Sequence, residues 1–227
     1  MTTKSQIDTT QTPIPEGPRV RNLPSQIKSR ERVRDLAEVY TRDEEINAML
    51  DLVGDVSHNV EVRFLEPSAG NGNFLVRILE RKLASALGKS RGTGKRKACV
   101  QKDFEFYALM SFASIYAVDI DPVNVQEAHT RLRAHLKDMY SGVFNTLRAT
   151  EGFYSAVDYI LRLNVLQGDM LNGTHLIEFT EFSSPRMYKF TQRVYRLDDL
   201  LAAGLFGARK PAIREIPMMN YWELACV

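Results

Sequence analysis

The most informative stretch of this 227-residue chain is Phe64-Leu65-Glu66-Pro67-Ser68-Ala69-Gly70-Asn71-Gly72-Asn73-Phe74-Leu75. An apolar, β-favouring run over 60–65 leads into a turn with two glycines, and a helical pattern of apolar residues begins at Asn73. Glycine adopts positive φ and has no Cβ, so the backbone of such a turn can approach a ligand closely. The stretch therefore predicts a strand, a ligand cradle and a helix start, although an ordinary strand-to-helix turn can also contain Gly-x-Gly.

Two later segments have the pattern of a buried strand that ends in an acidic residue. The apolar run 115–118 leads to Asp119, and the segment Leu163-Asn164-Val165-Leu166 is followed three residues later by Asp169. The carboxyl ends of parallel strands meet at one edge of a sheet, and ligands of open α/β folds bind there. We therefore expect Glu66, Asp119 and Asp169 to share one edge.

The residues from Glu66 to Phe74 resemble motif I of the S-adenosylmethionine-dependent DNA methyltransferases that methylate the N6 amine of adenine. They look most like the methylase subunits of restriction–modification systems. The segments around Asp119 and Asp169 are similar to motifs II and III of that family, and the similarity covers residues 38–172. It implies an α/β fold with a Rossmann-like class I methyltransferase sheet, in a truncated three-layer α-β-α arrangement with a C-terminal β-hairpin.

The resemblance also implies which residues bind the cofactor, S-adenosyl-L-methionine. It assigns Asp119 to the ribose hydroxyls and places Ile120 against the adenine ring. Asp169 would accept a hydrogen bond from the adenine amine, and Met170 would cover the ring face. The implied cofactor-binding residues are Tyr40, Thr41, Glu66, Pro67, Ser68, Ala69, Gly70, Asn71, Gly72, Asn73, Phe74, Asp119, Ile120, Asp169 and Met170.

Two of these residues have an alternative explanation. Tyr40 and Thr41 precede a helical pattern, at the place of the family's motif X, which packs against the methionine end of the cofactor. Thr41 can equally be a helix N-cap, with Glu44 at the capping-box position. A capping threonine needs no ligand to explain it.

The catalytic motif of the family, Asp/Asn/Ser-Pro-Pro-aromatic, has no counterpart here, because the chain contains no Pro-Pro. The nearest segment offers Ser184 and Pro185 as catalytic candidates. The flanking runs 176–182 and 188–195 alternate between apolar and polar residues, which favours a β-hairpin with a Ser-Ser-Pro-Arg turn over a degenerate catalytic loop. Such a hairpin could complete the parallel sheet in an antiparallel direction.

Composition limits the partners. The formal net charge is only +2, so any surface for DNA must be local. The candidates are the basic loop 89–97 and the basic end of the N-terminal arm, although both can simply be solvated. Cys99 and Cys226 lack Cys or His partners at ligand spacing, which predicts free thiols in a reducing cytoplasm and no metal site. No apolar run is long enough to span a membrane, and the N-terminus does not resemble a signal peptide.

The chain divides into three parts. We expect residues 1–28 to be a proline-containing flexible arm without periodicity, 29–206 a methyltransferase-like α/β domain, and 207–227 a C-terminal tail. Within the domain, periodicity predicts helices over 29–53, in two segments, and over 73–87, 103–112, 122–140, 152–161 and 197–206.

These observations favour an S-adenosylmethionine-binding DNA methyltransferase of the adenine-N6 type, or a methylase subunit of a restriction–modification system. One alternative is a non-catalytic subunit that keeps the cofactor fold and binds DNA or a partner protein, since the catalytic motif is missing. Another is a methyltransferase that acts on RNA, protein or a small molecule. An NAD-binding Rossmann protein is disfavoured, because Leu75 stands where its third glycine would be.

Overall fold

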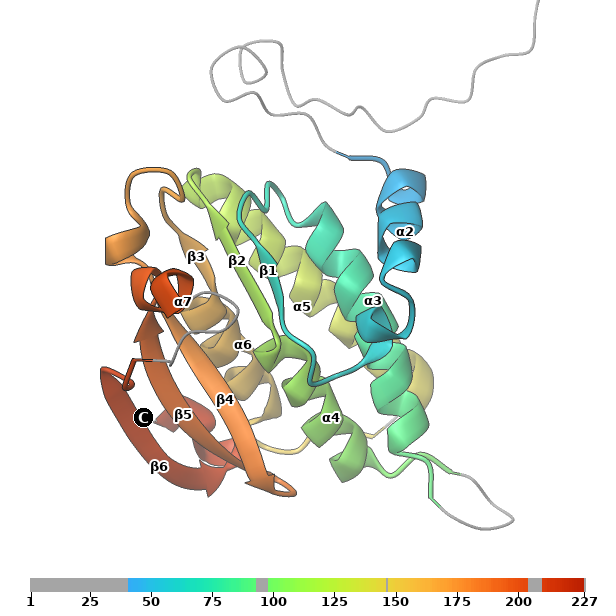
Figure 1. The fold of residues 1–227 in the computed structure, drawn as a ribbon. Coiled ribbons are helices and arrows are strands. Elements are labelled where there is room, and N and C mark those ends of the chain that lie inside the picture. Colours follow the sequence, from blue (N-terminus) through green and yellow to red (C-terminus); the bar gives the residue numbers. More distant parts are fainter. Residues whose placement is uncertain (1–40, 93–97, 146, 204–209, 227) are drawn as a thin grey trace, which may run out of the picture.

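The structure is a computed structural model that describes residues 41–92, 98–145, 147–203 and 210–226. Its central sheet consists of three parallel strands in the order β1-β2-β3, with β1 at Phe64–Glu66, β2 at Ile115–Asp119 and β3 at Val165–Gln167 (Figure 1). The expected α/β class is confirmed, and the parallel sheet is compatible with a Rossmann-like fold.

The helices begin and end near the sequence positions that periodicity predicted. Those expected over 73–87, 103–112, 122–140 and 152–161 are confirmed, each with small shifts at its ends. The α-helices are α2 (Asp43–Leu52), α3 (Asn73–Lys89), α4 (Gln101–Ala113), α5 (Pro122–Phe144), α6 (Phe153–Asn164) and α7 (Leu197–Ala203). The 3-10 helices are η1 (Gly54–His58), η2 (Thr174–Leu176) and η3 (Tyr221–Cys226).

Strand β1 is shorter than the predicted run over 60–65, and a buried lysine explains the difference. The Nζ of Lys82, on α3, donates to the carbonyl oxygens of Asn59 and Val62, each over 2.7 Å, and to Oγ of Ser114 over 2.8 Å. The Val62 carbonyl is therefore bonded to the side-chain nitrogen of Lys82, and regular pairing with β2 begins at Phe64.

The predicted hairpin is confirmed, but it does not complete the parallel sheet. Strands β4 (Glu178–Arg186) and β5 (Lys189–Arg196) join β6 (Arg214–Asn220) in a separate antiparallel sheet. The turn also differs from the expected Ser-Ser-Pro-Arg, since it lies at Met187 and Tyr188, and Tyr188 has a φ of 67°. Ser184 and Pro185 fall in an irregularity of β4 instead.

The two faces of the parallel sheet have different cover, which departs from the expected α-β-α layers. Helices α3 to α6 lie over one face, and the antiparallel sheet with α7 lies over the other (Figure 1). On that second face a small apolar cluster joins the two sheets; its buried members are Tyr116, Val118, Ile177, Phe179 and Leu197. The antiparallel sheet also packs directly against α4 and α6, where Phe190 lies against Phe106 and Phe182 against Tyr159.

The expected tail over 207–227 is wrong for the described residues from 210 onward. They form β6 and η3, and the Tyr221 side chain is fully buried in the main core. Its hydroxyl donates to Oε2 of Glu105 over 2.7 Å, and Glu105 is itself fully buried on α4. The end of the chain is thus part of the domain.

Several expectations concern residues outside the described ranges. They are the arm over 1–28, the helix up to residue 40 with Tyr40, and positions 93–97 of the basic loop. No helix in the described part of the chain combines the length and apolar character needed to cross a membrane. Cys99 and Cys226 are free thiols.

Candidate functional site

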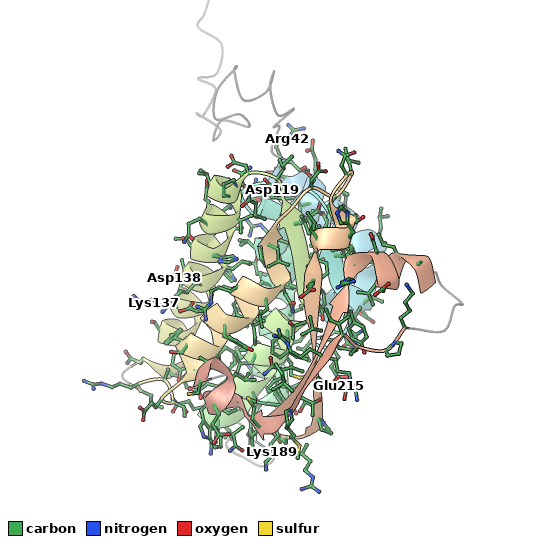
Figure 2. All side chains as sticks on the ribbon, turned by 90° about the vertical axis from the view of Figure 1, so that its left-hand side faces the viewer. Arg42, Asp119, Lys137, Asp138, Lys189 and Glu215 are labelled. Atoms are coloured by element: carbon green, nitrogen blue, oxygen red, sulfur yellow. The ribbon has the colours of Figure 1, made fainter. Side chains whose placement is uncertain are left out.

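The candidate site lies where the three parallel strands end. Backbone pairing continues past the strands, because the Ala69 N–H donates to the Val118 carbonyl and the Gly168 N–H donates to the Asp119 carbonyl, each over 3.0 Å. Asp119 therefore sits between the glycine turn and the end of the third strand. Figure 2 shows Asp119 at the same end of the molecule as Arg42, opposite Lys189 and Glu215.

Asp119 is the centre of this site and is only 6% exposed. Its Oδ2 accepts from the Gly70 N–H over 2.7 Å, and its Oδ1 accepts from the Asp121 N–H over 2.9 Å and from Nδ2 of Asn124 over 3.3 Å. An ionised carboxylate offers about four lone-pair positions. Three are occupied by the protein, so the group fixes the glycine turn and can still accept from a ligand.

The two glycines of the turn are required for different reasons. Gly70 has a φ of 52°, a conformation that places its N–H on Asp119. Gly72 has a φ of 85°, and a Cβ there would lie 2.9 Å from the Cβ of Ala128 on α5. Packing against α5 therefore explains Gly72 without a ligand, whereas Gly70 belongs to the contact with Asp119.

Asn71, between the glycines, is fixed by α5. Its Nδ2 donates to Oε1 of Glu127 over 3.1 Å, and its carbonyl accepts from Arg131 over 3.0 Å. Arg131 also donates to Oδ1 of Asn73 over 2.6 Å. The Oδ1 of Asn71 is buried and has no hydrogen-bond partner among the described residues. An unpaired buried acceptor is costly, so the turn keeps capacity for one more donor.

The turn has an acidic side chain, Glu66, on one side and the N–H groups at the start of α3 on the other. Burial raises the pKa of Glu66, and a 3.1 Å hydrogen bond from the Ser68 N–H opposes that rise. The N-cap of α3 is Gly72, which has no capping side chain, and the first turn of α3 has no acidic residue. The first N–H groups of α3 therefore remain available to an anion.

Asp169 and its neighbours form the far side of the site. The Asp169 carboxylate accepts from the Leu171 N–H over 2.8 Å, and from the N–H and Nδ2 of Asn172, each over 3.1 Å. The Asn172 side chain and these backbone donors lower the pKa of Asp169, so it is ionised at neutral pH. Met170 packs against the apolar cluster between the sheets, while Ile120 is 58% exposed.

The remaining residues of the motif I stretch lie around the turn. Pro67 and Ser68 are exposed, Ala69 is buried, and Phe74 is half-buried against the main core. Thr41 approaches the turn through its carbonyl, which accepts from Nδ2 of Asn73 over 3.4 Å. The N-cap of α2 is Arg42 and not Thr41, and the Arg42 N–H donates to Glu45, one residue beyond the predicted Glu44.

The catalytic candidates lie at the opposite end of the parallel sheet. Ser184 lines a cavity with Arg63, which precedes β1, and with Ser114, which precedes β2. The Ser184 hydroxyl donates to the Arg186 carbonyl over 2.9 Å, within its own strand. Because the cradle follows the carboxyl ends of the strands, the fold does not bring Ser184 or Pro185 to it.

Sequence reasoning missed the supporting residues Asn124 and Arg131 on α5. Asn124 is 3% exposed and interrupts an apolar stripe at a spacing of four, followed by Ala128, Leu132 and Leu136. A polar residue on such a stripe, five positions after the expected ribose acid, is a signal that could have been found. Arg131 gives no comparable signal, because its partners lie on a distant turn.

A scan against protein-family models, a search of curated proteins and a search of solved structures each returned no match for this chain. Within the described residues, no group of three or more His, Cys, Asp or Glu side chains could hold a metal ion. The interpretation of the site therefore rests on its own geometry.

Proposed function

We propose that the chain binds S-adenosylmethionine in the cradle around Gly70 and Asp119, as a DNA methyltransferase of the adenine-N6 type or as a methylase subunit of a restriction–modification system. The observation that carries this proposal is the contact between the Asp119 carboxylate and the glycine turn. It combines an acceptor for ribose hydroxyls with a closely approachable backbone at the carboxyl edge of a parallel sheet.

The amino-acid part of the cofactor fits the electrostatics of the turn. Its ammonium group would pair with Glu66, whose half-buried carboxylate accepts one hydrogen bond from the described residues, from the Ser68 N–H. Its carboxylate would accept from the uncapped N–H groups at the start of α3, where no acidic side chain competes. A zwitterion therefore finds both complementary charges within one turn.

The nucleoside part fits the adjoining strand ends. Asp119 keeps about one lone-pair position for a ribose hydroxyl. The exposed Ile120 side chain offers an apolar surface to an adenine face, and Asp169 is an ionised acceptor for the adenine amine. Bound cofactor supplies an electrophilic methyl group, and the chain's own contribution here is to hold and orient it.

The position of Ser184 and Pro185 favours the second candidate, a non-catalytic subunit with the cofactor fold. No described residue near the cradle reproduces the amine-positioning motif, and the nearest sequence match lies at the other end of the sheet. In this version a partner subunit supplies the acceptor site, and the basic residues at the start of the 89–97 loop are candidates for contact with DNA phosphates.

Calorimetric titration with S-adenosylmethionine and with S-adenosylhomocysteine tests cofactor binding. The informative variant is Ile120→Asp, and its matched control is Val123→Asp, because the two side chains are 58% and 59% exposed and lie three positions apart. We expect micromolar binding by the wild type and by Val123→Asp, and a loss of about tenfold or more in Ile120→Asp. A folded wild type that binds neither compound refutes the proposal.

Transfer of a labelled methyl group separates the two candidates once binding is established. Duplex DNA that contains adenine is the first acceptor, and RNA and mixed protein extracts are the comparison acceptors. Turnover on DNA by the chain alone supports the methyltransferase. Binding without turnover on any acceptor supports the non-catalytic subunit.

A further inference from the structure

We propose that the free edge of β4 is a docking site for an extended peptide segment of a partner protein, with one apolar side chain of that segment in the cavity beside Phe182. This proposal does not rest on the cofactor site, because β4 reaches its cavity at the opposite end of the parallel sheet.

The first observation is the direction of the β4 backbone. Strand β4 lies at one edge of its sheet, paired only with β5 among the described strands. The Thr180 N–H and carbonyl bond to the side-chain amide of Asn164, each over 2.9 Å, so they face away from β5. Its pairing partner Val194 likewise accepts from Ile213, on the far side of β5.

Phe182 has the same backbone orientation as Thr180, because the N–H and carbonyl groups of a strand alternate between its two sides from one residue to the next. Phe182 pairs with Gln192, two residues further in the same register, so its N–H and carbonyl also face the free edge. Asn164 takes the place of a neighbouring strand at Thr180, but no described side chain does so at Phe182. An unpaired strand edge is a template for an added strand.

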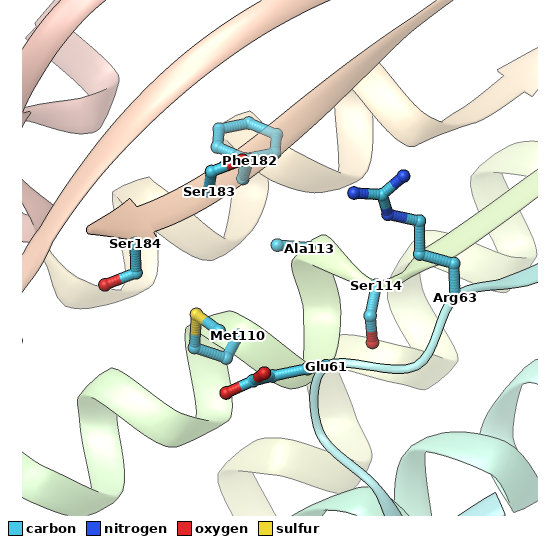
Figure 3. Close-up of a pocket in the computed structure, with 8 residues that line it drawn as sticks. All are labelled: Glu61, Arg63, Met110, Ala113, Ser114, Phe182, Ser183 and Ser184. Atoms are coloured by element: carbon cyan, nitrogen blue, oxygen red, sulfur yellow. The ribbon is translucent and has the colours of Figure 1, made fainter. Parts of the chain in front are cut away.

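The second observation is a cavity of about 250 Å³ at this edge (Figure 3). Its apolar wall consists of Met110, Ala113 and Phe182, and its polar rim consists of Glu61, Arg63, Ser114, Ser183 and Ser184. In strand addition the main chain supplies the hydrogen bonds, and pockets for alternate side chains supply the selectivity. The cavity is placed to receive one such side chain.

The third observation is incomplete cover of the face of the parallel sheet that meets the antiparallel sheet. Leu65 pairs with Tyr116, whose side chain belongs to the apolar cluster between the sheets, so Leu65 points to the same face. Leu65 is nevertheless 44% exposed. This face therefore keeps exposed apolar surface on β1 that the antiparallel sheet does not cover.

Charge indicates the chemistry of the partner segment. Arg63 forms an ion pair with Glu181 of β4 through one guanidinium nitrogen. The guanidinium has five N–H groups, so further donors remain for a second carboxylate. Arg186 and Lys189 flank the hairpin turn at the end of the edge, against Glu61 on the other side of the cavity. The edge therefore fits a segment with an apolar anchor and neighbouring acidic residues.

Selection of random octapeptides displayed on phage against the full chain tests the proposal even while the partner is unidentified. Selected peptides are synthesised and their affinities measured by fluorescence polarisation. Ser184→Tyr fills the cavity, and Ser141→Tyr adds the same side chain on an exposed position of α5. We expect Ser184→Tyr to weaken binding about tenfold or more and Ser141→Tyr to leave it unchanged.

An N-methyl scan of the selected peptide tests strand pairing without any change to the protein, and so stays decisive if Ser184→Tyr fails to fold. Removal of an N–H should abolish binding at alternate positions only, because successive groups of a strand point to opposite sides. The proposal is overturned if the selected peptides bind Ser184→Tyr as well as the wild type, or if the N-methyl scan shows no alternation. It is also overturned if the selection yields no binding peptides. Sedimentation showing a dimer that Ser184→Tyr dissociates overturns it as well, since the occupant is then a second copy.

Discussion

The backbone N–H of Gly70 donates a 2.7 Å hydrogen bond to Oδ2 of Asp119, 49 positions later in the chain. The glycine turn after β1 is thereby tied to the end of β2. Because Oδ1 of the same carboxylate accepts from Asp121 and Asn124, one side chain fixes the turn and the start of α5 together. The candidate cofactor site is therefore organised by the hydrogen bond between Gly70 and Asp119.

Asp119→Ala should therefore reduce stability as well as ligand binding. Three donors, on Gly70, Asp121 and Asn124, lose their acceptor in a buried place, which we expect to cost about 3 kcal/mol in the free energy of unfolding. Urea denaturation measures the loss. The control is Asp121→Ala, which removes the cap on Val123 and should cost about 1 kcal/mol. Equal losses in the two variants would contradict the central role of Asp119.

Gly72→Ala should destabilise the fold through contact with α5. The added Cβ would lie 2.9 Å from Ala128 at a φ of 85°, so we expect a loss of about 3 kcal/mol. Gly54→Ala, at a φ of 54° with nothing within 4 Å, should cost only the backbone strain of about 1 kcal/mol. Thermal unfolding compares them. Ala128→Gly should recover part of the Gly72→Ala loss, and no recovery would place the strain elsewhere.

Local patterns in the sequence predicted the elements that are stabilised locally. The strand that ends at Glu66, the acids near the ends of the next two strands and the α3 to α6 helices follow from apolar periodicity, and α5 also has the Asp121 cap and Pro122 at its start. The hairpin over β4 and β5 follows from alternation in the same way. These parts of the candidate site were predictable because each signal lies within a few residues.

The rest depends on contacts that no local pattern encodes. Strand β6 contains Pro217 and does not alternate, and it forms because β5 offers a partner, with a register shift where Pro217 falls. The buried charges Lys82 and Glu105 look like ordinary surface residues in sequence, and only the fold surrounds them with acceptors or donors. Alternation also does not say which sheet a hairpin joins, and this hairpin builds a second sheet with β6.

Tyr221→Phe should loosen the C-terminal segment. The Tyr221 hydroxyl donates over 2.7 Å to the buried Glu105, which also accepts from Tyr140, Gln101 and the Thr150 N–H. A hydrogen bond to a charged group contributes about 2 kcal/mol. Tyr159→Phe is a matched control, because that hydroxyl donates to the neutral amide of Gln192 over 2.9 Å and should contribute about 1 kcal/mol. Urea midpoints compare the two, and a smaller loss in Tyr221→Phe would contradict the stronger hydrogen bond to Glu105.

The last prediction concerns pH and the buried Lys82. Burial lowers the pKa of Lys82 to about 7 from its ordinary value of 10.5. Between these two values the unfolded chain binds more protons at this position than the folded chain, so stability should rise with pH across that window. From pH 7 to about pH 9.5 the gain should reach about 3 kcal/mol.

Lys82→Met should lack this rise, and the difference between the two urea-derived pH profiles isolates the lysine from other titrating groups. The comparison should stop near pH 9.5, because Tyr140 and Tyr221 have raised pKa values, owing first to burial and then to Glu105, and they act in the opposite direction above about pH 10. The acceptors on Asn59, Val62 and Ser114 lose their donor in the variant, so its stability should be lower at every pH. Parallel profiles for wild type and variant would mean that Lys82 stays protonated in the core.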